Sequence, residues 1–406
     1  MFDVEKVRAD FPLLKRTING KLIVYLDSTA SSLKPQSVID AMDYYYENVS
    51  ANVNRGLHKL SEEASETYEN AHESVGKFIG GKGEETAFSK NCTESINLVA
   101  YSLLESGYFK AGDKIVVSEA EHHANLVPWQ FVAKKTGAQL EFVKVGEDFE
   151  LDLEDAQRKI DQKTKLVALA HVYNTIASIN PVEKIGKMAH EKGALFLVDG
   201  AQSVPHMPVN VRKLNCDFLA FSAHKMCGPT GIGALWAKKE WLEKATPFLY
   251  GGDMIYSVSL REAKWNKVPE KFEAGTPPIA EAYGWKAACE YLQKIGMQEV
   301  QKHDQEITKY ALEKLVEIGS VRVFGPNGER GATILFETPK LSAHELALAL
   351  DEEANVCVRS GMHCAEPIVS KLNAKGLARA SFYLYTSKQE IDVFAQSLQK
   401  IVSAFH

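Results

Sequence analysis

The chain has 406 residues, of which 45% are hydrophobic and 25% are charged, and its 53 acidic and 47 basic side chains give a formal net charge of -6. A chain of this length exceeds one compact core, so we expect a large domain and a smaller one. The absence of a basic block argues against a nucleic-acid-binding surface. No apolar run is long enough to span a membrane, and residues 1–6 lack a signal-peptide core, so we expect a cytoplasmic protein without a membrane partner.

Short apolar runs alternate with helix-like segments through the first 240 residues. This is the βαβ rhythm of a parallel sheet, with one clear intervening helix at 185–192. The expected strands are 87–88, 115–117, 166–170, 195–198, 218–221 and 233–236.

The C-terminal part has a different pattern. A helical stretch at 280–319 is expected to join the two domains, and 332–337 and 379–384 are expected to be strands. Two capping boxes, Ser342 with Glu345 and Ser387 with Glu390, predict the start of two further helices.

A lysine and a carboxylate follow two of the predicted strands. Lys225 lies between the strand at 218–221 and a glycine-rich turn, and Asp199 ends the strand at 195–198. A lysine in a partly desolvated pocket is neutral more easily and can condense with the aldehyde of pyridoxal phosphate. A carboxylate at the matching strand end can keep the pyridine nitrogen protonated. Alone, Lys225 would be a surface lysine and Asp199 a helix cap; together they favour a cofactor site.

Donors for a phosphate and a ring to stack on the cofactor occur at the same expected sheet edge. Thr93 is predicted to cap a helix at the phosphate, and Ser222 and His224 offer further donors. His122 follows the strand at 115–117, where it could stack on the pyridine ring and move a proton; a pair of surface histidines is the alternative. Neither the adjacent histidines nor the six cysteines, which lack CxxC spacing, indicate a metal site.

Cys364 lies in a glycine-containing loop, beside His363 and close to Arg359. Cationic neighbours stabilise a thiolate, the form of cysteine that attacks. The alternative for a lone cysteine is a buried structural position, and this is what we expect of Cys357 in the preceding apolar run.

Seven motifs, in order along almost the whole chain, resemble those of the group II cysteine desulfurases of the SUF type, within the class V aminotransferase superfamily. The resemblance implies an α/β protein of fold type I, with a mainly parallel seven-stranded sheet in a large domain and a small α+β C-terminal domain. We place an N-terminal segment at 1–20, the large domain at 21–285 and the small domain at 286–406. The motifs are Tyr25-Leu26-Asp27-Ser28, Arg55-Gly56-Leu57-His58, Glu121-His122-His123-Ala124-Asn125, Val198-Asp199-Gly200-Ala201-Gln202, Ser222-Ala223-His224-Lys225, Phe272-Glu273-Ala274-Gly275-Thr276-Pro277 and Arg359-Ser360-Gly361-Met362-His363-Cys364-Ala365.

The resemblance also implies a role for each matching residue. Lys225 would bind the cofactor covalently, and Cys364 would be the nucleophile. The implied cofactor contacts are Thr93, Ser222 and His224 to the phosphate, His122 and Asp199 to the ring, Gln202 to the ring hydroxyl, and Thr276 to the phosphate of a neighbouring subunit. The implied substrate contacts are Asn174 and Arg379, which would hold the carboxylate, together with Arg359. One departure stands out: Asn91-Cys92 replaces a usual Gly-Thr, which would exchange one phosphate hydroxyl for a thiol.

The implied activity is the pyridoxal-phosphate-dependent conversion of L-cysteine to L-alanine, which leaves a persulfide on Cys364. A homodimer would pass this sulfur to an acceptor protein of the SUF system for iron–sulfur cluster assembly. A selenocysteine lyase acting on L-selenocysteine, or another class V transaminase, would use the same scaffold. A non-catalytic scaffold for sulfur assembly is a further alternative, against which the presence of Lys225, Asp199 and Cys364 argues.

Overall fold

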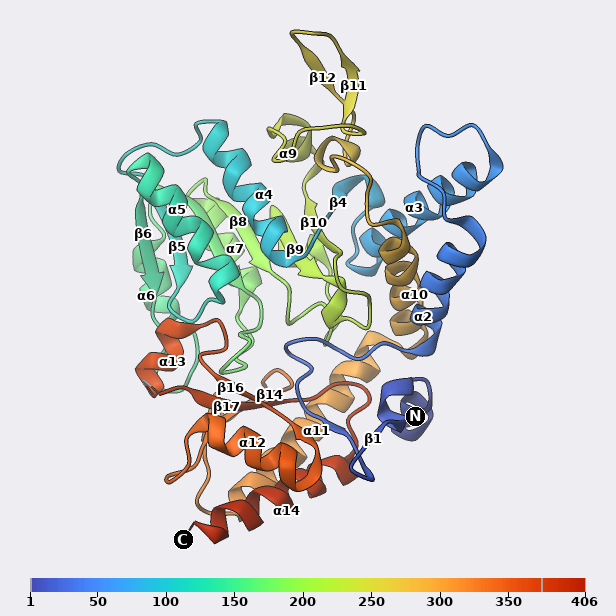
Figure 1. The fold of residues 1–406 in the computed structure, drawn as a ribbon. Helices are drawn as coiled ribbons and strands as arrows, with labels where there is room; N and C mark the ends of the chain where they lie inside the picture. The colour runs from blue at the N-terminus through green and yellow to red at the C-terminus, as the bar shows by residue number, and fades with distance from the viewer. Residues whose placement is uncertain (1, 374, 406) are drawn as a thin grey trace.

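A seven-stranded sheet with the order β4-β10-β9-β8-β7-β5-β6 forms the centre of the protein in a computed structural model, which describes residues 2–373 and 375–405 (Figure 1). It confirms each strand and the helix expected in this part of the chain and adds one strand, β6, that was not expected. The strands are β4 (Thr86–Ser89), β5 (Lys114–Ser118), β6 (Gln139–Val143), β7 (Thr164–Ala170), β8 (Leu195–Asp199), β9 (Phe218–Ser222) and β10 (Gly233–Ala237), and the helix is α7 (Val182–Glu191).

One strand departs from the parallel rhythm. β10 runs antiparallel to both β9 and β4, whereas β9, β8, β7, β5 and β6 are mutually parallel. β10 is antiparallel to β9 because residues 223–232 connect the two strands without the helical crossover that parallel neighbours need. The sheet is therefore mainly parallel, with the carboxyl ends of β5, β7, β8 and β9 at one edge.

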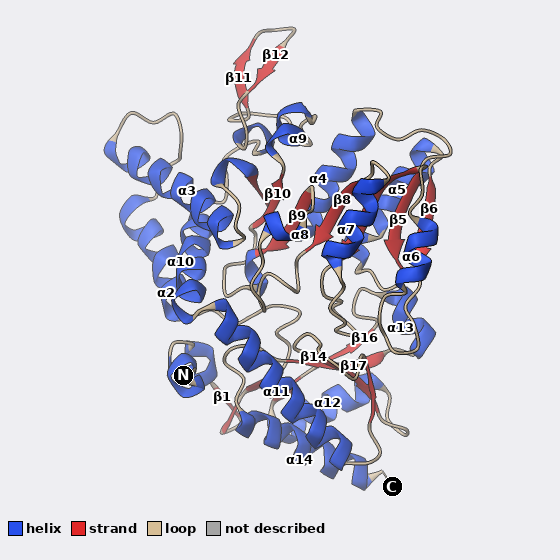
Figure 2. Cartoon of the chain, turned by 180° about the vertical axis from the view of Figure 1, so that it is seen from behind, coloured by secondary structure: helices blue, strands red, loops and turns tan. Residues whose placement is uncertain are grey.

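Helices cover both faces of this sheet, and alternate strand residues pack on opposite sides. Val116 belongs to the core cluster that includes Ile185 of α7, whereas Val117 belongs to the cluster that includes Trp129 of α5 (Val127–Thr136). Figure 1 shows α4 (Cys92–Glu105) and α5 on the near face, and Figure 2 shows α7 on the opposite face. Both faces are buried, which explains the near-continuous apolar sequence of the strands.

The helical stretch expected at 280–319 is two helices, α10 (Ile279–Ile295) and α11 (Met297–Glu317). The chain breaks at Gly296, whose φ of 91° lies in the left-handed region that a glycine adopts without a steric penalty. α10 packs against α2 (Gln36–Tyr44) and α3 (Lys59–Phe78), and α11 leads to a second sheet below the first (Figure 1).

The second sheet has four antiparallel strands in the order β13-β14-β17-β16. The strand expected at 379–384 ends at Ser381, because Tyr383 turns away and donates its backbone N–H to Thr386 Oγ1 before the next helix begins. Both capping boxes are confirmed, at the starts of α12 and α14. The elements are β13 (Arg322–Phe324), β14 (Thr333–Glu337), α12 (Ala343–Ala354), β16 (Arg359–Gly361), α13 (Glu366–Leu372), β17 (Leu377–Ser381) and α14 (Lys388–Ala404).

Shorter elements complete the fold. β3 pairs in parallel with β15, so the N-terminal strand lies beside the C-terminal part of the chain. A hairpin of β11 and β12 projects from the body of the protein (Figure 1). Among the described residues, no helix has both the length and the apolar character that a membrane crossing requires. These elements are α1 (Val4–Ala9), β1 (Thr17–Ile18), β2 (Lys21–Leu22), β3 (Val24–Tyr25), α6 (Leu153–Lys159), α8 (Val211–Leu214), α9 (Lys239–Lys244), β11 (Ile255–Val258), β12 (Ala263–Trp265) and β15 (Val356–Cys357).

Candidate active site

A cavity of about 290 Å³ lies at the carboxyl edge of the large sheet, where ligand sites of open α/β sheets form. It brings together residues that are up to 350 positions apart in the chain, from Thr29 to Arg379. Every site residue predicted from the sequence lines it, except Thr276. These residues are Thr93, His122, Asn174, Asp199, Gln202, Ser222, His224, Lys225, Arg359, Cys364 and Arg379.

Thr276 lies outside the cavity of its own chain. Its side chain is exposed in a different hollow, and Asn52 Nδ2 donates to its Oγ1 over 3.4 Å. The geometry therefore leaves Thr276 available to another molecule.

Lys225 and Asp199 occupy matching positions after two adjacent strands. Lys225 ends the short 3₁₀ turn Ala223–Lys225 that follows β9, and Asp199 is the last residue of β8. Burial lowers the pKa of Lys225, while the nearby Asp199 carboxylate opposes this shift. Burial also raises the pKa of Asp199, against the hydrogen bond that Ala201 N–H donates to its Oδ1 over 2.9 Å. The predicted pair is thus held in one desolvated site.

His122 is a neutral ring in this cavity. Burial, and secondarily the charge of Lys225, lowers its pKa to about 3. Its Nδ1 accepts the backbone N–H of Ala124 over 3.0 Å, so the proton of the neutral ring is on Nε2. The ring can therefore stack on a ligand and donate one proton.

The start of α4 differs from the prediction. The N-cap is Asn91, whose Oδ1 accepts the N–H of Glu94 over 3.0 Å, and Thr93 lies in the first turn. Asparagine and threonine are both favoured as N-cap residues, so the N-cap preference of the residue types does not distinguish Asn91 from Thr93. The thiol of Cys92 is also not directed at a phosphate site as predicted, because its Sγ lies 3.4 Å from Asp199 Oδ1. Only the backbone N–H of Cys92 reaches Ser222, at 2.8 Å from Oγ.

Gln202 and His224 are fixed by the segment 29–34. Gln202 Nε2 donates to the backbone carbonyl of Thr29 over 2.9 Å. The side-chain carbonyl oxygen of Gln202 is therefore left to accept a hydrogen bond from another group. The carbonyl of His224 accepts from Ser32 N and from Lys34 Nζ, over 2.9 and 3.0 Å. Burial lowers the pKa of His224 to about 4, so its ring is a neutral donor.

Two arginines that are partners across β16 and β17 have different environments. Arg379 is buried at 3% exposure, donates to the carbonyl of Asn174 over 3.1 Å and has an Nε without a partner among the described residues. Burial lowers its pKa to about 10, although Asp27 opposes this. The Arg359 side chain is half exposed and makes a three-bond contact with Asp27, at 2.9 to 3.2 Å. Asp27, which pattern analysis left without a role, therefore holds both arginines.

Cys364 is exposed at the mouth of the cavity, in a loop held at two points. Asn174 Nδ2 donates to the carbonyl of His363 over 2.8 Å, and His123 N–H donates to the carbonyl of Cys364 over 2.7 Å. His363 and Cys364 both have φ near +50°, a strained conformation outside glycine that the loop contacts maintain.

The charges around this loop differ from the sequence expectation. His363 is not a cation, because burial lowers its pKa to about 3 and its Nε2–H donates to the carbonyl of Leu377. The cationic groups that interact with Cys364 are Arg359, Arg379 and, when protonated, Lys225. Cys357 is part-buried rather than fully buried, and burial raises the pKa of its thiol to about 11. Its thiol is therefore protonated at neutral pH.

A buried carboxyl that the sequence analysis missed directly precedes His122 in the chain. Glu121 accepts from Ser118 Oγ, Asn125 Nδ2 and the backbone N–H of Ala170, over 2.6 to 2.9 Å. It is 1% exposed, and burial raises its pKa to about 8. These bonds connect β5, the turn after it and β7, and no local sequence signal reveals such a connection.

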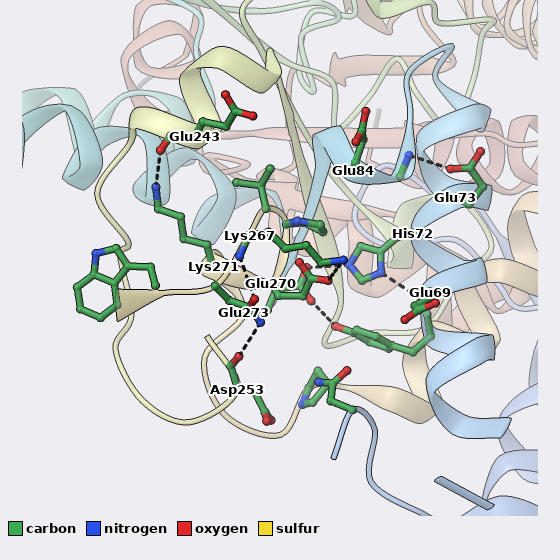
Figure 3. A pocket seen from close by; sticks show the side chains of 18 of the residues that line it. Glu69, His72, Glu73, Glu84, Glu243, Asp253, Lys267, Glu270, Lys271 and Glu273 are labelled. Carbon is green, nitrogen blue, oxygen red and sulfur yellow. Dashed lines mark hydrogen bonds and ion pairs between the residues drawn. The ribbon is translucent and has the colours of Figure 1, made fainter. Parts of the chain in front are cut away.

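A larger cavity, of about 700 Å³, lies elsewhere and contains none of the predicted residues (Figure 3). Its central group is Glu273, which accepts from His72 Nε2, Tyr68 Oη and the backbone N–H of Phe88 over 2.6 to 2.8 Å. Because His72 and Tyr68 of α3 and Phe88 of β4 all donate to the Glu273 carboxylate, these hydrogen bonds connect α3 and β4 to the segment before α10.

Comparison with known proteins assigns the family. Residues 24–394 match the family model described as "Aminotransferase class-V". A protein of Haloferax volcanii named "Cysteine desulfurase" is 46% identical, over 98% of this chain and 96% of its own length. The apo structure of a cysteine desulfurase from Thermococcus onnurineus NA1 superimposes with a TM-score of 0.94 at 43% identity and covers 98% of both chains. The structure of the Escherichia coli cysteine desulfurase CsdA in its S-sulfonic acid form has a TM-score of 0.92 at 32% identity, over 100% of this chain and 99% of that one. With this match over nearly its whole length, the chain belongs to the class-V aminotransferase family.

Proposed function

We propose that the protein is a pyridoxal-phosphate-dependent cysteine desulfurase that converts L-cysteine to L-alanine and retains the sulfur as a persulfide on Cys364. The observation that carries this proposal is the meeting of Lys225, Asp199 and Cys364 in one cavity. The relatives of similar length that are named cysteine desulfurases support it.

The residues of the cavity fit pyridoxal phosphate. Asp199 is 5% exposed, and its Oδ2 accepts no hydrogen bond from the described residues, so it can accept one from a protonated ring nitrogen. Thr93, Ser222 and His224 would hold the phosphate, and Gln202 the ring hydroxyl. When bound, the cofactor supplies an electron sink that makes the Cα–H and C–S bonds of the substrate easier to break.

The chain's own residues then orient the substrate and move protons. Arg379 and Asn174 bind the substrate carboxylate, for which the unpartnered Nε of Arg379 is a buried donor. Lys225 Nζ is neutral more readily because of its burial and removes the Cα proton, and the Nε2–H of His122 is a nearby proton donor. The thiolate of Cys364 attacks the substrate sulfur, the C–S bond breaks, and L-alanine leaves after its Cα and Cβ have each taken up a proton.

The test of this proposal is a product assay. Purified protein with pyridoxal phosphate and L-cysteine should release alanine and, with a thiol reductant, an equal amount of sulfide. 3-Mercaptopyruvate in place of alanine would indicate transamination, and binding of L-cysteine without any product would indicate a scaffold. Activity with L-selenocysteine alone would assign a selenocysteine lyase instead.

We further propose a cytoplasmic homodimer with the domain boundaries given above, which passes its sulfur to an acceptor protein of the SUF system. A reducing compartment would keep Cys364 as a thiol. The exposed Thr276 would reach the phosphate in a second copy. Mixing a Thr276→Ala chain with a Lys225→Ala chain should then restore activity, because each heterodimer contains one intact site. Subunit exchange without recovery would place Thr276 outside the phosphate site.

A further inference from the structure

The proposed reaction does not use the thiol of Cys92, which points into the centre of the site. Cys92 is the first residue of α4 and is 5% exposed. Its Sγ lies 3.4 Å from Asp199 Oδ1, a distance suited to a hydrogen bond that involves sulfur.

The direction of this hydrogen bond follows from the chemistry of the two groups. Burial, and then the Asp199 charge, raises the pKa of the Cys92 thiol well above its ordinary value, so the thiol remains protonated. A carboxylate can only accept, and the thiol is therefore the donor. Asp199 Oδ1 accepts both this S–H and the N–H of Ala201, whereas no described residue donates to Oδ2.

Contacts of the backbone hold the thiol in this place. The N–H of Cys92 donates to Ser222 Oγ over 2.8 Å, and the preceding Asn91 caps α4. Asn91 also lies against Gly233 of β10, where a Cβ would be only 2.5 Å from Asn91 Cα. The first turn of α4 is thus fixed between β9 and β10, with its thiol directed at the end of β8.

We propose that Cys92 is a positioning residue that donates its S–H to Asp199 Oδ1 and so keeps Oδ2 directed at the ring nitrogen of pyridoxal phosphate. This inference rests on the proposed function. It makes the Cys92 thiol a part of the electrostatic support of the cofactor, distinct from the sulfur chemistry of Cys364. Because a thiol is a weak donor, the effect of removing it is modest.

The test compares Cys92→Ala, which removes the donor, with Cys92→Ser, which keeps one in a side chain of nearly the same size. The measurement is the equilibrium dissociation of pyridoxal phosphate and of its 1-deaza analogue, in which carbon replaces the ring nitrogen. Cys92→Ala should weaken pyridoxal phosphate binding by about two- to tenfold relative to Cys92→Ser, as expected for one hydrogen bond from a weak thiol donor. The two variants should bind the deaza analogue equally, since it offers nothing to Asp199 Oδ2.

A second readout is independent of cofactor affinity. The infrared difference spectrum between wild-type holoenzyme and Cys92→Ala isolates the S–H stretch of Cys92, which should move to higher frequency in Asp199→Asn as the acceptor loses its charge. An S–H stretch that Asp199→Asn leaves in place would overturn the inference, and so would equal binding of pyridoxal phosphate by the alanine and serine variants. Failure of the wild-type protein to bind pyridoxal phosphate at all would refute the proposed function itself, and the inference with it.

Discussion

The two arginines at the cavity offer a matched comparison, because they are cross-strand partners with different contacts. We expect Arg379→Lys to impair L-cysteine turnover strongly and Arg359→Lys to impair it little. The Nη1 of the buried Arg379 donates to Asn174, and its Nη2 lies 3.6 Å from Asp27 Oδ1, but its Nε has no hydrogen-bond partner among the described residues. Nε can therefore donate to a carboxylate in the plane of the guanidinium, whereas lysine presents a single point charge. Arg359 already directs its donors at Asp27.

The expected magnitudes follow from these environments. One charge-assisted hydrogen bond contributes about 1.5–3 kcal/mol, so its loss in Arg379→Lys should lower kcat/KM by roughly 10- to 150-fold. The Arg359 side chain is 51% exposed, and an exposed ion pair contributes only about 0.2–1 kcal/mol, so Arg359→Lys should lower kcat/KM by less than about fivefold.

The assay is steady-state alanine formation over a range of L-cysteine concentrations, with the thermal unfolding of each variant measured in parallel. Most of the loss in Arg379→Lys should be an increase in KM, because the carboxylate is bound before and during the reaction. A loss of kcat/KM in Arg359→Lys equal to that in Arg379→Lys would refute the reasoning, provided both variants unfold near the wild-type temperature.

Three further predictions concern the lysine, the nucleophile and the buried histidines. Borohydride reduction followed by peptide mapping should place the cofactor on Lys225, and Lys225→Ala should bind it without a covalent bond; a label on another lysine would contradict the site. Cys364→Ala should still bind pyridoxal phosphate but lose sulfur transfer, and brief exposure of the wild type to L-cysteine should add one sulfur to the Cys364 peptide by mass spectrometry. Burial lowers the pKa of His171 from its ordinary value of 6.5 to about 4, so between these pH values the unfolded chain binds a proton that the folded chain does not. The free energy of unfolding is therefore unaffected by His171 protonation above pH 6.5 and falls by about 3 kcal/mol as the pH falls to 4. Denaturant unfolding of His171→Gln should accordingly show a weaker pH dependence between pH 6.5 and 4 than the wild type, while a His344→Gln control at an exposed site should not.

The sequence by itself determined six of the seven strands of the large sheet, all except the edge strand β6, and the position of most polar side chains at the sheet edge. Strands that are buried on both faces are continuous apolar runs, and a polar residue at the end of such a run, as at Asp199, Ser222 or Lys225, has to face the carboxyl edge. The capping boxes at Ser342 and Ser387 were equally readable, because the signal is complete within four residues.

Only the tertiary structure decided the features that depend on distant segments. Antiparallel β10 follows from a short connection, and the break at Gly296 from a backbone angle, and neither changes the apolar pattern. The neutral state of His363 arises from burial within the folded loop, whereas the sequence pattern predicts a cationic neighbour of Cys364. The contact of Cys92 with Asp199 joins residues 107 positions apart. Local sequence encodes which groups reach the edge of the sheet, but packing decides which of them meet, which are desolvated and which are already occupied by a partner.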